Sequence, residues 1–303
     1  MIMDIKDLRI VFMGTPEFAE ACLRSLVGYG CNVVAVVTMP DKPIGRHGSV
    51  LQSSPVKKYA LEAGIPVLQP ERLKDPDFLE QLASYRAQLQ IVVAFRMLPE
   101  QVWNMPPMGT FNLHASLLPQ YRGAAPINWA IINGDSETGV TTFFLKHEID
   151  TGDIIHRESL PILDTDNAGT LHDKLMELGS KLCCRTVQDI LDGNVHPVSQ
   201  CEIPQDELRP APKIFKETCR IDFGKTSREV HNFVRGLSPY PAAWCDLTIA
   251  DRQMENVKIF AVRPSQGGTP LSVKTADGYV DILELQAPGK KRMAAKDFLN
   301  GLR

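Results

Sequence analysis

The 303-residue sequence contains little that would place the protein in a membrane or outside the cell. No apolar run approaches the roughly 20 residues that a membrane-spanning helix needs. Residues 1–7 lack the basic stretch and the following apolar stretch that mark a secretory signal. The seven cysteines are odd in number and include no Cys-x-x-Cys pair, which argues against a disulfide framework and against a zinc ribbon. We therefore expect a cytoplasmic protein with reduced thiols and no membrane contact.

Several cofactor and nucleotide motifs are also absent. The seven histidines show no His-x-x-x-His spacing, so no metal site is expected. The chain opens with an apolar run, Gly14 and a helical pattern, but residues 14–19 lack the second and third glycines of G-x-G-x-x-G. Neither G-x-x-x-x-G-K-[ST] nor G-x-S-x-G occurs. These absences exclude a nicotinamide-dependent dehydrogenase and argue against ATP hydrolysis and a serine nucleophile.

The small net charge of −3 conceals an uneven distribution along the chain. Residues 205–303 contain 16 Lys and Arg against 12 Asp and Glu, a net charge of +4, which leaves −7 for the remainder. A mildly basic module beside an acidic one is compatible with a partner that is bound through phosphates, such as a nucleic acid. An ordinary solvated surface would have the same charge, so the pattern only permits this partner.

The first two thirds of the chain alternate between apolar runs and helical patterns. The runs predict strands at 9–13, 31–38, 90–95, 110–114 and 141–145, and the periodicity predicts helices at 16–27, 55–63, from 75, and at 170–191. Strands that are apolar on nearly every position are typical of a parallel sheet covered on both faces. The fold class predicted is therefore α/β, with a doubly wound, mostly parallel sheet.

This alternation ends near Gly193. Residues 193–206 contain two prolines and little periodicity, so they are interpreted as a linker. Farther on, short alternating segments at 257–262, 271–275 and 280–285 are separated by glycine-containing turns, which indicates a small antiparallel β-barrel or sheet. We expect a catalytic domain at 1–192 and a β domain at 207–303.

Three polar residues suggest acyl-transfer chemistry. Asn112 and His114 are two apart on a predicted strand, so their side chains should point to the same side. Asp150 could return to that place after the next helix and strand. An amide, an imidazole and a carboxylate can together bind an oxyanion and move a proton. Each residue alone is more simply explained as a turn or core residue, so the hypothesis depends on all three.

The sequence around these residues resembles the folate-dependent formyltransferases. The resemblance rests on Asn-Leu-His-Ala-Ser-Leu-Leu-Pro at 112–119, Tyr-Arg-Gly-Ala-Ala-Pro at 121–126 and Asp-Thr-Gly-Asp at 150–153. Within that family, the members that act on methionyl-tRNA are the most similar, as judged from further matching segments at 14–19, 40–46, 54–57 and 288–293. The resemblance covers nearly the whole chain, and a composite of this length is far more specific than a short motif.

The resemblance implies a reaction, its partners and an architecture. The formyl donor would be 10-formyltetrahydrofolate, the acceptor the α-amine of methionine on initiator tRNA, and the enzyme a monomer without a metal. The catalytic residues would be Asn112, His114 and Asp150. The β domain would resemble an oligonucleotide-binding fold.

The resemblance also implies binding residues. The folate would be bound by Ser116, Leu117, Leu118, Pro119, Phe95 and Met97. The tRNA would be contacted by Lys42, Arg46, Lys290, Lys291 and Arg292.

Three alternatives remain open at the level of the sequence. A sugar-nucleotide amine formyltransferase would keep the chemistry and change the acceptor, and a formyltetrahydrofolate hydrolase would use water. A tRNA-binding module without catalysis is the third, although the intact set of Asn112, His114 and Asp150 argues against it. An assay with labelled formyl donor and each acceptor would separate these alternatives.

Overall fold

A computed structural model describes residues 4–44, 50–203, 207–249 and 252–301. The chain divides into two compact units. The N-terminal unit comprises residues 1–122, 139–159 and 173–209, and the C-terminal unit comprises 123–138, 160–172 and 210–303. Within the described ranges, no helix is both long enough and apolar enough to cross a membrane. All seven cysteines are free thiols, and six of them are buried.

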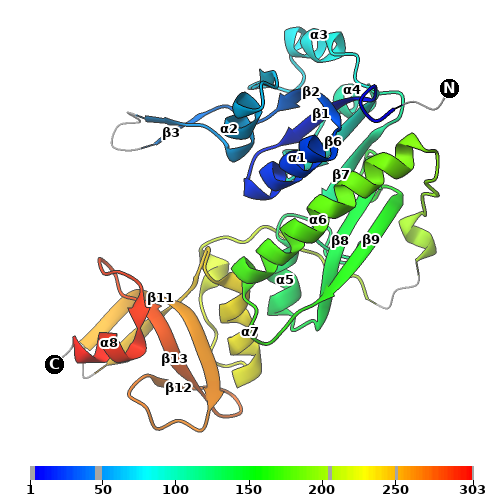
Figure 1. The fold of residues 1–303 in the computed structure, drawn as a ribbon. Helices are drawn as coiled ribbons and strands as arrows, with labels where there is room; N and C mark the ends of the chain where they lie inside the picture. Colours follow the sequence, from blue (N-terminus) through cyan, green and yellow to red (C-terminus); the bar gives the residue numbers. More distant parts are fainter. Residues whose placement is uncertain (1–3, 45–49, 204–206, 250–251, 302–303) are drawn as a thin grey trace. The chain divides into compact units, whose positions relative to one another are not determined.

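A seven-stranded sheet forms the centre of the N-terminal unit (Figure 1). Its strand order is β5-β2-β1-β6-β7-β8-β9. The strands are β1 (Arg9–Gly14), β2 (Asn32–Val37), β5 (Val67–Leu68), β6 (Leu89–Val93), β7 (Thr110–His114), β8 (Glu137–Phe144) and β9 (Ile154–Pro161). The pairings from β5 to β7 are parallel, whereas β7 pairs antiparallel with β8. The prediction of a mostly parallel sheet is therefore confirmed.

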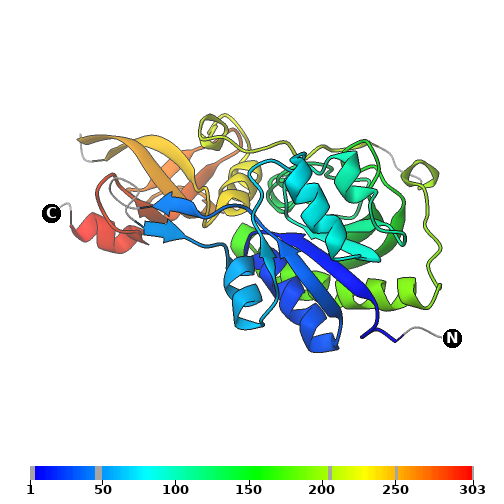
Figure 2. The ribbon, with the colours of Figure 1, turned by 90° about the horizontal axis from the view of Figure 1, so that it is seen from above.

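Helices cover both faces of this sheet, which explains why its central strands are apolar throughout (Figure 2). The helices are α1 (Glu17–Tyr29), α2 (Pro55–Glu62), α3 (Pro76–Ser84), α4 (Glu100–Trp103) and α6 (Ala168–Leu191). On one face, Val11 and Met13 of β1 share a core cluster with Phe78 of α3 and Val102 of α4. On the other face, α6 lies so close that Gly179 touches Leu113.

Helix starts follow the signals in the sequence. Ser54 and Asp75 accept hydrogen bonds from backbone N–H groups of α2 and α3, and a proline follows each of them in the first turn. The sequence did not predict α4 or the hairpin of β3 (Lys42–Ile44) and β4 (Val50–Gln52). At the base of that hairpin Asp41 forms an ion pair of 2.6 Å with Lys57, which fixes where the hairpin leaves the sheet.

The C-terminal unit is an antiparallel half-barrel sheet with helices packed against it. Its strand order is β10-β11-β13-β12, and β14 pairs with β13. The elements are α5 (Pro126–Ile132), α7 (Ser227–Leu237), β10 (Ala243–Ile249), β11 (Arg252–Ser265), β12 (Ser272–Lys274), β13 (Tyr279–Gln286), β14 (Met293–Ala294) and α8 (Ala295–Asn300). Val230 and Val234 of α7 pack on Ile259 and Ile282 of the sheet. This agrees with the predicted fold class.

The predicted boundary between the two modules stays a prediction. The compact units exchange segments near 122, 138, 159 and 172, so they do not coincide with the ranges 1–192 and 207–303. The predicted linker 193–206 falls within the N-terminal unit, where Gln200 begins the 3-10 turn η2 (Gln200–Glu202). Residues 204–206 lie outside the described part of the chain.

Candidate active site

Strand β7 presents the first two of the three predicted catalytic residues. Asn112 pairs with Val92 of β6 on one side and with Phe143 of β8 on the other. His114 is the last residue of the strand, and its side chain is buried. Because the two positions are two apart on one strand, they face the same side of the sheet, at the carboxyl end of β7. Open α/β sheets bind their ligands at this edge.

The environment of His114 fixes one of its ring nitrogens. Nε2 lies 2.8 Å from the carbonyl oxygen of Tyr121. Since a carbonyl can only accept, Nε2 carries the proton and donates it. In the neutral ring, Nδ1 is then a proton acceptor, and it becomes a donor only when the imidazole is charged.

The carboxamide of Asn112 contains a polar atom that the folded chain leaves unsatisfied. Its Oδ1 is buried and has no hydrogen-bond partner among the described residues. Leaving a buried polar atom without a partner costs about 1–3 kcal/mol, and such atoms are few in native structures. An amide in this state is suited to a hydrogen bond with a bound ligand.

Asp150 lies in the loop between β8 and β9, in an uncommon backbone conformation. Its φ is +55°, in the left-handed region that residues with a side chain seldom adopt. Two residues on, Gly152 passes so close to β8 that an added Cβ would stand 1.6 Å from the carbonyl oxygen of Phe144. The loop can follow this path only because residue 152 is a glycine.

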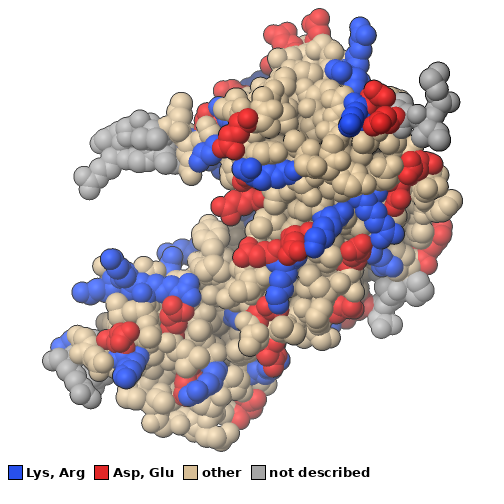
Figure 3. All heavy atoms as spheres, in the orientation of Figure 1, with Lys and Arg blue, Asp and Glu red and all other residues tan. Residues whose placement is uncertain are grey.

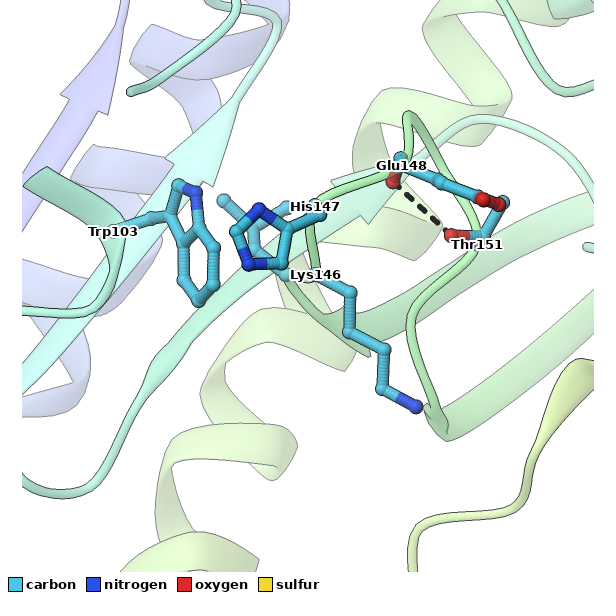
Figure 4. Close-up of a pocket in the computed structure, with 6 residues that line it drawn as sticks. Trp103, Lys146, His147, Glu148 and Thr151 are labelled. Atoms are coloured by element: carbon cyan, nitrogen blue, oxygen red, sulfur yellow. Dashed lines mark hydrogen bonds between the residues drawn. The ribbon is translucent and has the colours of Figure 1, made fainter. Parts of the chain in front are cut away.

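A hollow of about 340 Å³ opens beside this loop (Figure 4). It is lined by Trp103, Leu145, Lys146, His147, Glu148 and Thr151. The rings of Trp103 and His147 meet edge to face with 5.5 Å between their centroids, and Thr151 donates a hydrogen bond to the carbonyl of Glu148. The volume is within the range of small-molecule sites. The sequence did not single out these residues, although five of them lie within five positions of Asp150.

Much of the segment Ser116–Pro119 is buried. The side chain of Ser116 is fully buried and donates to the carbonyl of Gln120. Leu118 is fully buried in a cluster with Phe143 and Ile154, and Leu117 lies against Gly139. Most backbone groups of the segment are also paired within the protein, since Leu118 N–H donates to Thr141 and the carbonyls of Ser116, Leu117 and Leu118 accept from Thr141, Gln120 and Arg157.

The remaining predicted folate residues follow β6. Phe95 is half-buried against the cluster of α3 and α4, whereas Met97 is 71% exposed. Between them Arg96 donates to the carbonyls of Pro70 and Glu71, which ties this loop to the segment after β5. Because its side chain is exposed, Met97 can contact a ligand. Phe95 mainly packs against the core cluster and so holds the loop in place.

The predicted tRNA residues differ in how much of their charge is available. Arg46 lies outside the described residues, and Lys42 is exposed on β3. Lys290 and Lys291 are exposed in the C-terminal unit. Arg292 forms two hydrogen bonds to the carboxylate of Glu284, at 2.7 and 2.6 Å, and stacks on Phe260. Its charge is therefore partly compensated within the unit.

Lys and Arg side chains gather over the part of the C-terminal unit where β11 lies (Figure 3). In the described part of the chain, no three His, Cys, Asp or Glu side chains are arranged to hold a metal ion.

Comparison with known proteins gives full-length matches. The "Formyl transferase" family matches residues 8–187, and "Formyl transferase, C-terminal domain" matches 213–303. "Methionyl-tRNA formyltransferase" of Parabacteroides distasonis is 58% identical, covering 99% of this chain and 98% of that protein. The protein of the same name from Phocaeicola vulgatus is 61% identical with the same coverage.

Solved structures share the fold at low sequence identity. HypX from Aquifex aeolicus, in complex with tetrahydrofolic acid, has a TM-score of 0.64 at 19% identity, and the match covers 96% of this chain and 46% of HypX. An N-formyltransferase from Helicobacter canadensis, bound to folinic acid and dTDP-3-aminofucose, has a TM-score of 0.64 at 20% identity, covering 94% of this chain and 99% of that one.

Proposed function

Since the chain belongs to the methionyl-tRNA formyltransferases, we propose that it transfers the formyl group of 10-formyltetrahydrofolate to the α-amine of methionine on initiator tRNA. The observation that carries the proposal is the identity of 50–61% to proteins of that name over 99% of this chain. Initiation of translation takes place in the bacterial cytoplasm, and we propose the same compartment for this enzyme. A monomer is proposed as its working form.

In the proposed mechanism, the neutral α-amine attacks the formyl carbon, a new C–N bond forms, and the bond to N10 of the folate breaks. Attack places negative charge on the formyl oxygen and positive charge on the attacking nitrogen. Asn112 donates an N–H to that oxygen, which is typically worth about 3–4 kcal/mol in the transition state. The buried Oδ1 of Asn112, which has no hydrogen-bond partner among the described residues, is free to accept from an N–H of the attacking amine.

His114 and Asp150 handle charge and the proton. With Nε2–H donated to Tyr121, His114 presents Nδ1 to the reaction: the charged ring stabilises the oxyanion, and the neutral ring accepts a proton. Asp150 stabilises the charged ring and takes the amine proton, directly or through water. The proton is finally delivered to N10, so that N10 leaves as a neutral amine.

The formyl donor is a folate, and its proposed site is at the carboxyl ends of β6 and β7, where Phe95, Met97 and Ser116–Pro119 follow the strands. Met97, which is 71% exposed, and the partly exposed Leu117 supply apolar surface for a flat ring system. The hollow beside the Asp150 loop lies at the other end of β7, because Leu145 donates to the carbonyl of Thr110 and Thr110 donates to the carbonyl of Trp103.

The test offers the purified protein 10-formyltetrahydrofolate, labelled in the formyl group, with initiator methionyl-tRNA, an amino-sugar nucleotide, or water. We expect label in formylmethionyl-tRNA and little in the other two reactions. Uncharged initiator tRNA is the matched control, because it offers the same phosphates without the α-amine. Transfer to the sugar nucleotide alone, or release of formate alone, would contradict the proposal and favour the corresponding alternative.

A further inference from the structure

Gln200 is a buried polar side chain in a segment that the sequence suggested to be a linker. It is 1% exposed and begins the turn η2. A buried carboxamide has two N–H groups to donate and one oxygen that accepts twice, and each needs a partner. Its partners therefore indicate what this residue does.

All four hydrogen-bonding positions of Gln200 are occupied. Its Nε2 donates to the carbonyl oxygens of Asp150 and Gly152, at 2.9 and 2.8 Å. Its Oε1 accepts from Nε and Nη2 of Arg122, at 3.0 and 2.6 Å. The positive guanidinium polarises the amide and strengthens the two bonds that the amide donates. Arg122 and Gln200 thus act as one unit on the loop.

Gln200, held by Arg122, contacts the loop at Asp150, where the backbone conformation is uncommon. Asp150 has a left-handed φ, which is unfavourable for a residue with a side chain. The two carbonyls bound by Gln200 belong to the 150–151 and 152–153 peptides, so the two bonds hold the planes of these peptides on either side of Thr151. The direction of the Asp150 side chain follows from those planes.

The same segment also contacts His114. Arg122 directly follows Tyr121, whose carbonyl accepts the hydrogen bond from Nε2 of His114. One dipeptide therefore contacts His114 through its backbone and the Asp150 loop through its side chain and Gln200. These contacts all lie within the N-terminal unit.

Gln200 is itself held from both sides. Val198 exchanges two backbone hydrogen bonds with Ile154 of β9, at 2.8 and 2.9 Å. Ile203 packs on the buried cluster of Leu118, Phe143 and Ile154. These contacts keep the segment in place without the Gln200 side chain, so a change at Gln200 should leave the fold intact.

We propose that Arg122 and Gln200 are positioning residues for formyl transfer, which orient Asp150 relative to His114 through the carbonyls of Asp150 and Gly152. This inference rests on the proposed function, because it assumes that Asp150 takes part in that reaction. Neither residue needs to touch the substrate, so their removal should lower the rate of the chemical step and leave substrate binding largely intact.

Gln200→Glu is the sharpest variant. It keeps the shape and the acceptor for Arg122, but it replaces the two donors by oxygen facing two carbonyl oxygens. We expect kcat to fall roughly 10- to 100-fold, the scale of a small misplacement of a reacting group. The KM for methionyl-tRNA should stay within about twofold, since the phosphate contacts lie elsewhere. Gln188→Glu on α6 makes the same chemical change away from the loop and should leave kcat unchanged.

A second measurement separates positioning from a general structural role. In an Asp150→Ala background, Gln200→Glu should cause no further loss, because the group it positions is absent. Gln200→Glu and Arg122→Leu should likewise combine non-additively, with the double variant no worse than Gln200→Glu. Additive losses in both cycles would overturn the inference.

The outcomes also distinguish this inference from the proposed function. If the unmodified protein does not formylate methionyl-tRNA, the proposed function fails. If it does, and Asp150→Ala is inactive while Gln200→Glu keeps its kcat, only the positioning inference fails. If thermal melting shows that Gln200→Glu does not fold, Arg122→Leu is the variant that tests the inference, since it leaves the bonds from Gln200 to the loop in place. A fall in kcat that is absent in the Asp150→Ala background supports the inference. An unchanged kcat overturns it.

Discussion

At His114 a single hydrogen bond decides which ring nitrogen can take part in chemistry. The carbonyl of Tyr121 holds Nε2–H, so a substrate can meet only Nδ1. Tyr121 adopts φ +60°, in the left-handed region, so this carbonyl is presented by a turn of the backbone. The tautomer is therefore a consequence of the loop that follows β7.

We predict that Asn112→Ala, His114→Ala and Asp150→Ala each lower turnover by at least about a hundredfold, the scale of losing a preorganised donor or a proton-transfer group. The measurement is single-turnover formylation of methionyl-tRNA by protein whose melting temperature is close to that of the parent. Asn194→Ala, on the exposed turn after α6, is the matched control for the loss of an amide. If Asn112→Ala, His114→Ala or Asp150→Ala turns over at the parent rate, the substituted residue takes no part in the mechanism.

At the scale of elements, α7 carries a histidine that reports on its packing. Nδ1 of His231 donates to the carbonyl of Val262 on β11, at 2.9 Å. Burial lowers the pKa of His231 from its usual value, and the neighbouring charges of Arg235 and Arg228 lower it further, against the opposing effects of the hydrogen bond to Val262 and of Asp164. The folded protein thus favours the neutral ring.

The pH dependence follows from this shift. Below the usual histidine pKa of about 6.5, the unfolded chain binds a proton at this position that the folded chain does not yet bind. Stability is therefore fully present above pH 6.5 and is lost as the pH falls through that value toward the lower folded pKa. We predict that the melting temperature of His231→Gln falls less between pH 7 and pH 5 than that of the parent protein. Above pH 7, the melting temperatures of the two proteins should depend on pH in nearly the same way. An equal pH dependence in parent and variant would exclude His231 as its source.

At the scale of the whole molecule, the proposed division into modules predicts where a protease cuts. Two proposed modules, 1–192 and 207–303, imply a first cleavage between 193 and 215, where most described residues are exposed. Within that range we expect cleavage outside 198–203, because that stretch is hydrogen-bonded to β9 and to the Asp150 loop. Mass spectrometry of the first fragments is the measurement, and a primary cut inside 90–150 contradicts the division.

Binding of tRNA should be sensitive to salt through specific cations. We predict that Arg46→Ala weakens the use of methionyl-tRNA without affecting folate binding, and that Lys290→Ala with Lys291→Ala acts similarly but less severely. Each lost phosphate contact should flatten the slope of log affinity against log salt by about one unit, because one fewer counterion is released. Filter binding across a salt series measures this slope. If Arg46→Ala changes neither the tRNA affinity nor the slope, Arg46 does not contact a tRNA phosphate.

Arg292 serves as an internal comparison in that experiment. Its guanidinium is already paired with Glu284 and stacked on Phe260, so it has less charge to offer a phosphate than Lys290 or Lys291. Arg292→Ala should therefore change the salt slope least of the three, although it removes an interaction within the C-terminal unit.

Local signals in the sequence are sufficient to predict most of the longer helices and strands and the type of chemistry. Apolar runs such as 89–93 specify buried parallel strands, and Ser54 and Asp75 mark helix starts, because these signals are local. The motif around Asn112, His114 and Asp150 was sufficient to identify the family. Short elements without a periodic pattern, such as α4 and the β3–β4 hairpin, could not be predicted.

Only the tertiary structure decided how these residues are held. The tautomer of His114 depends on the carbonyl of Tyr121, which the chain brings back by its own turn. The role of Gln200 depends on partners about 50 and 78 residues away in the chain, so no local pattern could reveal it, and its proline-bearing surroundings suggested a linker. A hydrogen bond between distant residues forms only when folding has brought β8, β9 and the following segment together. Spacing along the chain does not show which distant residues become neighbours, so such a bond cannot be predicted from it.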